Sequence, residues 1–291
     1  MRIPLTKYGW PQVVIYPAAL LTVMIVFLLS TQHQLGLGPR LIGAGLLAVI
    51  LIWSLMFFRD PDRRCPSDRN FLLAPADGHV TDIERVDPLR DPTLDFLLVR
   101  DREDKGSNGV NDPPAFLRKQ EGGCGAALRI GVFLSIFDTH INRAPCNVKV
   151  EKITYRKGKY KNAMNPQSGR VNESNDLHLV RTDSPQDRLI VRQISGAIAR
   201  RIVCDKVQGK ELISGQKFGM IKFGSRTELY VPLREAARQG SDRHPPVAGA
   251  KCLVQIGDKV KAGLTPLVKY EIQNNGKHEA RNPKYETNPK F

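Results

Sequence analysis

Three short polar groups downstream of the apolar N-terminal part have side chains that could do chemistry. The first is Asp77, which sits in a Pro-Ala-Asp-Gly turn ahead of a strand-like run. The second group follows the apolar run 133–137 and consists of Asp138, His140, Asn142 and Arg143. The third is the pair Gly224-Ser225, which joins two apolar, strand-like runs. These residue types can supply a base, a nucleophile and the charges that orient them.

His140 is the candidate general acid or base, because an unperturbed imidazole titrates near neutral pH. A lone histidine is more often structural. Among the six histidines, however, only His140 directly follows an apolar run and has charged neighbours at alternate positions. Asp77 has a plain structural alternative, since an aspartate in a turn commonly bonds its own backbone.

Gly224 has no Cβ beside the carbonyl carbon that the Ser225 hydroxyl could attack. With a base to take the hydroxyl proton and a donor for the oxyanion, the acyl group could move to the serine oxygen as an ester. A Gly-Ser pair between strands is otherwise an ordinary turn or bulge. The pair therefore acquires meaning only beside Asp77 and His140.

Other common kinds of site are missing from the sequence. It has no HExxH motif, no clustered His and Cys residues, no GxGxxG, no phosphate-binding P-loop and no GxSxG. We therefore predict no metal site. The five cysteines are scattered and form no CxxC, which indicates small, buried, reduced thiols in a cytosolic compartment.

Two uncharged apolar runs, at about 13–30 and 41–58, are each long enough to cross a bilayer as a helix. A cleaved signal peptide is the alternative for the first run, but its length and the second run argue against that. A buried helical hairpin is the other alternative, but a helix at the surface of a soluble protein would show a polar stripe, which both runs lack. We predict a membrane anchor over residues 1–60.

Basic residues set the expected orientation and partner. Arg2 and Lys7 precede the first run, and a cluster follows the second, so the positive-inside rule places both ends and the following domain on the cytoplasmic side of the cell (inner) membrane. The net charge of +15 predicts an anionic partner, either nucleic acid or an anionic bilayer. The two predicted spans favour the bilayer, so we expect no nucleic acid.

Residues 61–273 are expected to form the catalytic β domain, because short β-branched or alternating runs are separated by Gly, Pro and Asn. Strands are predicted at residues 94–99, 128–136, 148–155, 177–181, 188–195, 198–205 and 227–231. Residues 101–120 are predicted to be a surface loop, and 274–291 a flexible basic tail. The stretches 207–219 and 254–263 share their glycine spacing, which is typical of hairpins in a compact lipoyl/biotinyl-like barrel-sandwich.

The motifs together resemble the pyruvoyl-dependent phosphatidylserine decarboxylase family. The similar segments are FFRDP at 57–61, PADG at 75–78, FDTHINRAP at 137–145, FGMI at 218–221 and FGSR at 223–226. Their order and spacing run over most of the chain. The FGSR motif is most similar to the shorter-chain branch of the family, since the longer branch has LGST.

The resemblance implies a proenzyme that cuts itself between Gly224 and Ser225 into a β chain (1–224) and an α chain (225–291). It implies that Ser225 is the nucleophile and becomes a covalent pyruvoyl group, that His140 is the base, and that Asp77 supports it. The enzyme would convert phosphatidylserine to phosphatidylethanolamine and CO₂ in phospholipid biosynthesis. The pyruvoyl ketone would bind the serine amine of the lipid and act as an electron sink.

One position departs from the longer branch, which has two histidines three residues apart in this motif. Here the later position is Arg143, so His140 serves both reactions, or Arg143 binds the carboxylate or phosphate of the substrate. Asn142 is a further candidate for substrate binding. The alternatives are a membrane-tethered lipoyl-like module that binds anionic lipid, and a decarboxylase of an ether-linked serine phospholipid. The oligomeric state, including a homo-oligomer, is left open.

Overall fold

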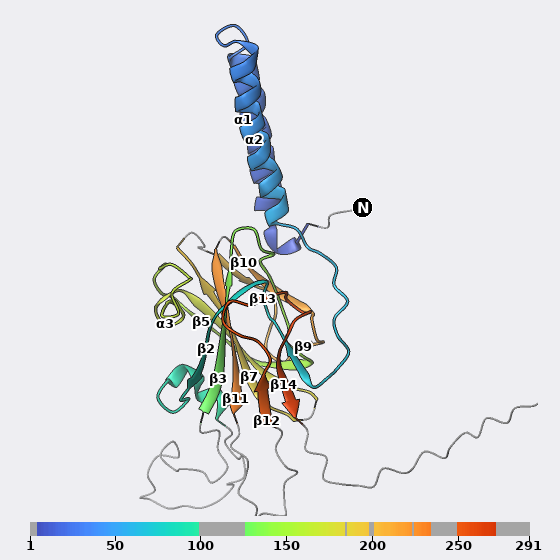
Figure 1. Cartoon of the computed structure of the whole chain (residues 1–291), viewed down its shortest axis with the longest axis vertical. Coiled ribbons are helices and arrows are strands. Elements are labelled where there is room, and N and C mark those ends of the chain that lie inside the picture. The colour runs from blue at the N-terminus through green and yellow to red at the C-terminus, as the bar shows by residue number, and fades with distance from the viewer. Residues whose placement is uncertain are drawn as a thin grey trace, which may run out of the picture.

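Two long helices form a hairpin that projects from one end of a β domain in the computed structural model (Figure 1). The structure describes residues 5–98, 126–183, 185–197, 201–222, 224–233 and 249–271. The predicted loop at 101–120 and tail at 274–291 therefore lie outside the described residues. The hairpin consists of α1 (Gln12–Ser30) and α2 (Leu37–Phe57). α2 begins before the predicted 41, because Pro39 is tolerated within the first turn of a helix.

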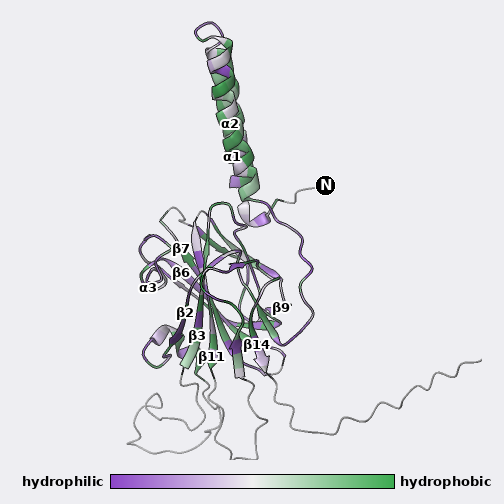
Figure 2. Cartoon of the chain, in the orientation of Figure 1, coloured by the Kyte–Doolittle hydropathy of each residue, from purple (hydrophilic) through white to green (hydrophobic). Residues whose placement is uncertain are grey.

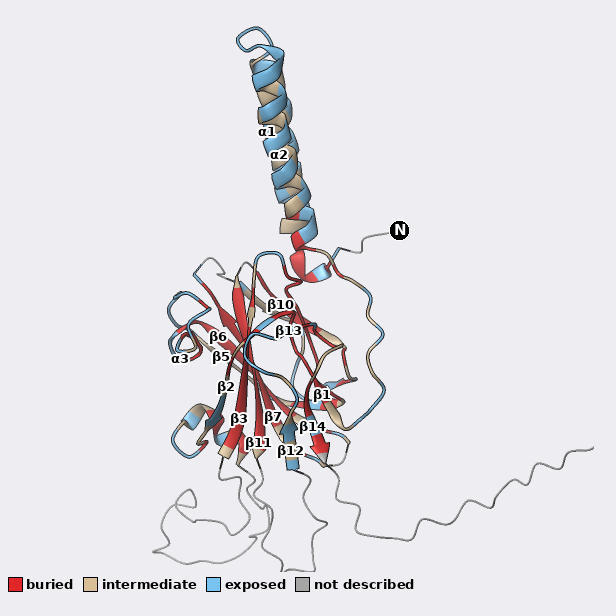
Figure 3. Cartoon of the chain, in the orientation of Figure 1, coloured by how far each residue is buried: buried red, intermediate tan, exposed pale blue. Residues whose placement is uncertain are grey.

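Both helices are long and apolar enough to cross a membrane. The hairpin is mostly apolar along its length in the view of Figure 2, and most of its surface is exposed away from the β domain (Figure 3). Only the base of the hairpin is buried, where Phe57 meets the domain. An apolar helix with no protein around it needs a lipid environment, so the structure fits the predicted membrane anchor.

The rest of the described chain is mainly β, as predicted. Its helical turns are η1 (Lys7–Gly9), η2 (Pro92–Leu97) and α3 (Ser168–Val171). Its strands are β1 (Phe71–Leu73), β2 (Gly78–Val86), β3 (Ala126–Leu134), β4 (Ile141–Arg143), β5 (Val148–Arg156), β6 (Ser174–Arg181), β7 (Arg188–Ser195), β8 (Arg201–Cys204), β9 (Glu211–Leu212), β10 (Lys217–Lys222), β11 (Ser225–Leu233), β12 (Gly249–Cys252), β13 (Lys259–Val260) and β14 (Pro266–Glu271).

One predicted strand, 94–99, is wrong. Most of it forms η2, because the Asp91 side chain accepts from the Thr93 backbone N–H and Pro92 suits the start of a helical turn. Leu94 and Leu97 still bury their side chains, packing beside Tyr230. The segment therefore buries two apolar side chains, but as a helical turn and not as a strand.

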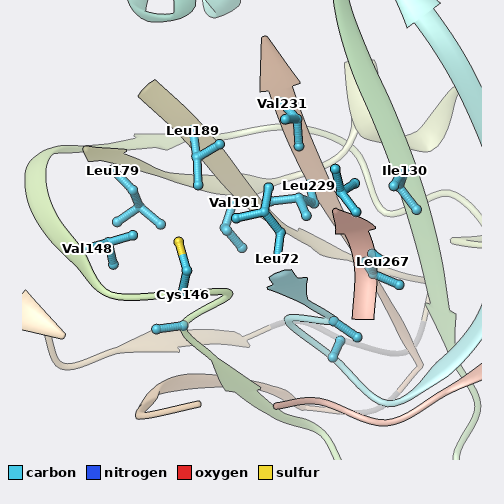
Figure 4. Packing of buried hydrophobic residues seen from close by; sticks show 14 of the residues in the cluster. Leu72, Ile130, Cys146, Val148, Leu179, Leu189, Val191, Leu229, Val231 and Leu267 are labelled. Atoms are coloured by element: carbon cyan, nitrogen blue, oxygen red, sulfur yellow. The ribbon is translucent and has the colours of Figure 1, made fainter. Parts of the chain in front are cut away.

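The strands form one curled eight-stranded sheet and two three-stranded sheets. The large sheet has the order β13-β2-β3-β11-β7-β6-β5-β9, and the small ones are β1-β14-β12 and β4-β10-β8. Apolar side chains from the large sheet and the small ones fill the space between them, as the close view in Figure 4 shows for Leu72, Val191 and Leu229. This arrangement agrees with the predicted barrel-sandwich.

The same backbone pattern occurs twice in the domain. Val80 exchanges backbone hydrogen bonds with the turn at Gly257, and Val150 does so with the turn at Gly209. Both glycines have positive φ (98° and 83°), as the repeated glycine spacing predicted. The two turns lead to β13 and β9, which form the opposite edges of the large sheet. The domain is thus built from two similar halves that meet between β11 and β7.

Candidate active site

Ser225 is the first residue of β11, near the centre of the large sheet. It pairs with Leu134 of β3 on one side and with Ser195 of β7 on the other. Its side chain is fully buried, and Oγ has no hydrogen-bond partner among the described residues. A buried hydroxyl without a partner is unfavourable for stability, which makes it a candidate for function.

Gly224 adopts a left-handed conformation, with φ of 63°. A side chain here would have open space but a strained backbone, so the conformation is what requires glycine. Its carbonyl oxygen lies against Gly196, just beyond β7. A Cβ on Gly196 would come within 2.1 Å of that oxygen. The carbonyl between Gly224 and Ser225 is therefore held in a narrow space.

His140 lies at the same place. Its Nε2 accepts the backbone N–H of Gly224 at 3.3 Å, and its Nδ1 lies 3.0 Å from the carbonyl oxygen of Asp138. A carbonyl can only accept, so Nδ1 carries the proton and donates, and Nε2 carries a lone pair. The structure thus directs the basic nitrogen of His140 at the residue that precedes Ser225.

Burial keeps this imidazole neutral. The side chain of His140 is fully buried, and desolvation lowers its pKa to about 4. The hydrogen bond to Asp138 and the charges of Asp138 and Asp77 oppose the shift, while Arg59 adds to it. A base that is unprotonated at neutral pH is ready to accept a proton from a hydroxyl.

Asp138 shapes the loop that carries His140. Its carboxylate accepts from the backbone N–H and the hydroxyl of Ser135, which closes the turn after β3. This leaves the Phe137 side chain 69% exposed at the tip, beside the base of the hairpin. Asp138 therefore acts on the position of His140 through its backbone.

Asp77 does not reach Ser225 or His140 by a hydrogen bond in the described part of the chain. Its carboxylate forms a two-point ion pair with Arg63, at 2.5 and 2.7 Å, and accepts the backbone N–H of Ala262. The charge still favours protonated His140 from a distance. The structure therefore brings His140 to the Gly224-Ser225 pair, and places Asp77 as a charge behind it.

Asn142 and Arg143 point to opposite sides of β4, as successive residues of a strand do. Asn142 is buried and bonds Thr227 and Gln193. Arg143 donates to the carbonyl oxygens of Gly215 and Pro61. It lines a cavity of about 570 Å³ together with Arg63, Lys206 and Lys217. Neither side chain bonds Ser225, so their assignment to substrate binding stays a prediction.

Sequence reasoning missed two residues at this site. Gly196 had no signal, because a single glycine after a strand is ordinary and its partner, Gly224, lies far along the chain. Phe57 was part of a recognised motif, but nothing in the sequence indicated that its ring packs on His140, with the ring centroids 4.4 Å apart. The FFRDP motif itself was the only available signal.

Comparisons with known proteins identify the family of the chain. Residues 50–267 match the family described as phosphatidylserine decarboxylase. A relative named phosphatidylserine decarboxylase proenzyme, from Pelagibacter ubique (strain HTCC1062), is 34% identical over 77% of this chain and 84% of its own length. A relative of the same name from Gluconacetobacter diazotrophicus is 35% identical over 74% of this chain and 76% of its own length. On motifs, fold and these similarities together, the chain belongs to the phosphatidylserine decarboxylase family.

Proposed function

We propose that the chain is the precursor of a membrane-bound phosphatidylserine decarboxylase that cuts itself between Gly224 and Ser225. The observation that carries the proposal is the buried Ser225 hydroxyl, which has no hydrogen-bond partner among the described residues. It directly follows Gly224, whose backbone N–H donates to the basic nitrogen of His140. Family membership supports the substrate, since both relatives are named for it. The apolar hairpin supports a site that works on lipid.

The self-cleavage uses only groups of the chain and water. His140 Nε2 releases the Gly224 N–H and takes the proton of Ser225 Oγ, which attacks the carbonyl carbon of Gly224. The peptide C–N bond breaks, the serine nitrogen takes a proton, and an ester joins the two residues. Removal of the Ser225 Cα proton then expels the Gly224 carboxylate. The resulting enamine gains a proton at Cβ, water replaces its nitrogen, ammonia leaves, and a pyruvoyl group stands at the start of β11.

The residues at hand fit such a group. Ser225 is already buried at the start of a central strand, and Gly196 lies close against the Gly224 carbonyl oxygen, where a side chain would not fit. The pyruvoyl ketone supplies the electron sink for decarboxylation. His140 is the residue placed to return a proton to the substrate Cα, since its imidazole lies at the same backbone position.

Membership of the family does not specify which membrane or which face the protein uses, and we infer these from the charges of the chain. The basic residues that flank the hairpin favour the cytoplasmic face of the cell (inner) membrane, with anionic lipid as the surface partner. Arg143, in its cation-lined cavity, is the candidate for the lipid phosphate or carboxylate, with Asn142 as the lesser one. The division into an anchor over 1–60, a catalytic domain over 61–273 and a tail over 274–291 belongs to the same proposal.

Intact-mass analysis of the purified chain tests the cut. We expect two pieces, 1–224 and 225–291, with a pyruvoyl group in place of the N-terminal amine of the smaller one. Ser225→Ala is expected to stay whole and to release no CO₂ from phosphatidylserine. Ser168→Ala is the matched control, because Ser168 is also buried with an unpartnered Oγ but lies in α3. A Ser225→Ala protein that still decarboxylates would overturn the proposal.

A further inference from the structure

The segment Phe57–Arg63, here called the strap, joins α2 to the β domain, and the proposed reaction assigns it no task. It contains the FFRDP motif. Its side chains do not simply lie on the surface. They contact the loop that carries His140, the strand that leads to the cut, and Asp77. The strap is therefore the physical connection between the membrane anchor and the site.

Phe57 makes the most direct of these contacts. Its ring packs on the His140 imidazole, with centroids 4.4 Å apart and the ring planes tilted by 39°. Both side chains are buried, with exposed fractions of 1% for Phe57 and 0% for His140. One face of the imidazole is thus covered by the last residue of the second membrane helix. An aromatic contact of this kind both orients a ring and excludes water from it.

Arg59 holds the other end of the same loop. Its guanidinium donates to the carbonyl oxygen of Phe137 at 2.6 Å. Phe137 lies between Ser135 and Asp138, the two residues whose hydrogen bonds close the turn before His140. The backbone of the loop and the ring of His140 are therefore both fixed from the strap.

The rest of the strap contacts the strands around the site. Asp60 accepts from Lys217 at the start of β10, the strand that ends just before Gly224. Arg143 donates to the carbonyl oxygen of Pro61. Arg63 forms the buried two-point ion pair with Asp77.

We propose that the strap is a positioning element of the self-cleavage site, in which Phe57 orients the His140 ring and keeps it dry. The proposal rests on the proposed function above. It follows that the precursor cuts itself efficiently only when the hairpin base is packed on the β domain. Phe57 exchanges no proton and forms no bond in the reaction, and it acts only through the His140 ring, so it is a positioning residue and not a catalytic one.

Because Phe57 acts through the imidazole of His140, we expect its effect to appear in the dependence of the self-cleavage rate on pH. The charged groups that influence His140 are Asp138 in its own loop, Arg59 in the strap and Asp77 in the turn before β2. None of them changes when Phe57 is shortened. Burial is the main cause of the low pKa of His140, so admitting water raises this pKa from about 4 toward its ordinary value of about 6.5.

The experiment uses the full-length precursor, made by cell-free translation into phospholipid nanodiscs and then shifted to buffers of different pH. The series Phe57→Leu, Phe57→Val and Phe57→Ala removes the ring and then progressively the volume. Phe96→Ala is the matched control, because Phe96 also packs its ring on a histidine, His178, with centroids 4.9 Å apart. Gel densitometry gives the cleavage rate at each pH.

We expect the wild-type rate to stay level down to about pH 5, and the midpoint of the profile to rise as residue 57 shrinks. For Phe57→Ala, we expect a midpoint at about pH 6.5, the ordinary pKa of histidine. Its cleavage rate at about pH 5.5 is then about tenfold below its rate at high pH. Phe96→Ala keeps the wild-type profile. If the alanine variant does not fold, the leucine and valine variants decide the question.

Midpoints that stay at the wild-type value throughout the Phe57 series would overturn the proposal, as would an equal shift in Phe96→Ala. A wild-type chain that is never cut would contradict the proposed function instead. The two failures are thus distinguishable, because the strap is judged only by differences among chains that are cut.

Discussion

Asp77 and Asn147 occupy equivalent turns in the two halves of the β domain. The Oδ1 atom of Asp77 accepts the backbone N–H of Ala262, and the Oδ1 atom of Asn147 accepts that of Ser214. An amide therefore does the structural work of this position in one half of the same fold. What distinguishes Asp77 is its charge, which pairs with Arg63 and favours protonated His140.

Removing the charge of Asp77 separates its structural role in the turn from its electrostatic effect on His140. Asp77→Asn keeps the turn, because Asn147 shows that an amide can fill it, but leaves Arg63 unpaired. We expect the free energy of unfolding to fall by about 3–5 kcal/mol, the usual cost of breaking a buried ion pair. Self-cleavage is expected to slow, because loss of the Asp77 charge lowers the pKa of His140 further and makes it a weaker base. Timed gels and denaturant unfolding check the two effects.

The control is the double variant Arg63→Gln with Asp77→Asn. It removes both charges, so we expect most of the lost stability to return while cleavage stays slow. If the double variant cut itself at the wild-type rate, the charge of Asp77 would have no part in the reaction.

Gly196→Ala should block the cut without touching a catalytic group. The new methyl group would meet the Gly224 carbonyl oxygen at 2.1 Å, so the scissile peptide has to shift. A displacement of about 1 Å can slow a reaction about a hundredfold, and overpacking costs about 1–3 kcal/mol. Intact mass after a fixed time would show uncut precursor.

Gly249→Ala is the matched control for this variant, because nothing lies within 4 Å of a Cβ at that position. It should be cut at the wild-type rate. A Gly196→Ala chain that is cut just as fast would show that the carbonyl is not confined as described.

The stability of the uncut precursor should depend on pH through His140. Its pKa in the folded chain, about 4, lies below the ordinary value because the imidazole is buried. Between about pH 6.5 and pH 4 the unfolded chain therefore binds a proton that the folded chain does not. The stability contributed is complete above about pH 6.5 and is lost on acidification, by about 3 kcal/mol in total.

Ser225→Ala is the suitable protein for this measurement, because it is expected not to change during the experiment. The same scan on Ser225→Ala with His140→Gln isolates the contribution of His140 from that of His178, whose pKa burial also lowers. We expect the midpoint of thermal unfolding to fall less steeply with acid in the double variant. Equal slopes in the two proteins would contradict the assignment of a buried neutral imidazole.

Features that depend on local pattern could be predicted from the sequence. The uninterrupted apolar runs indicated the hairpin, and the spacing of Gly209 and Gly215 matched that of Gly257 and Gly263 in the structure. The strand predicted at 94–99 failed because capping by Asp91 outweighed its alternating pattern.

Only those site residues that have a telling residue type or lie in a motif could be predicted from the sequence. Ser225 and His140 were assigned from their neighbours along the chain. The structure brings His140 to Gly224, the residue before Ser225, and the catalytic roles of both stay a prediction. Gly196 and Phe57 reach the site through strand register and through docking of the hairpin base. These contacts join residues far apart in sequence, and no periodicity or motif spacing encodes them.

For Asp77, the sequence offered a turn residue that bonds its own backbone or a support for His140. In the structure its carboxylate accepts the N–H of the distant Ala262 and pairs with Arg63, and its role toward His140 stays a prediction.

The central place of β11 has a consequence for the protein after its proposed cut. The strand is bonded along its length to β3 and, over its first part, to β7, both of which belong to the larger piece. β14, also in the smaller piece, pairs with β1. The two pieces are interwoven, so pulling them apart means dismantling the sheet. A severed chain of this kind remains one folding unit, and its new end stays anchored where the old peptide bond was.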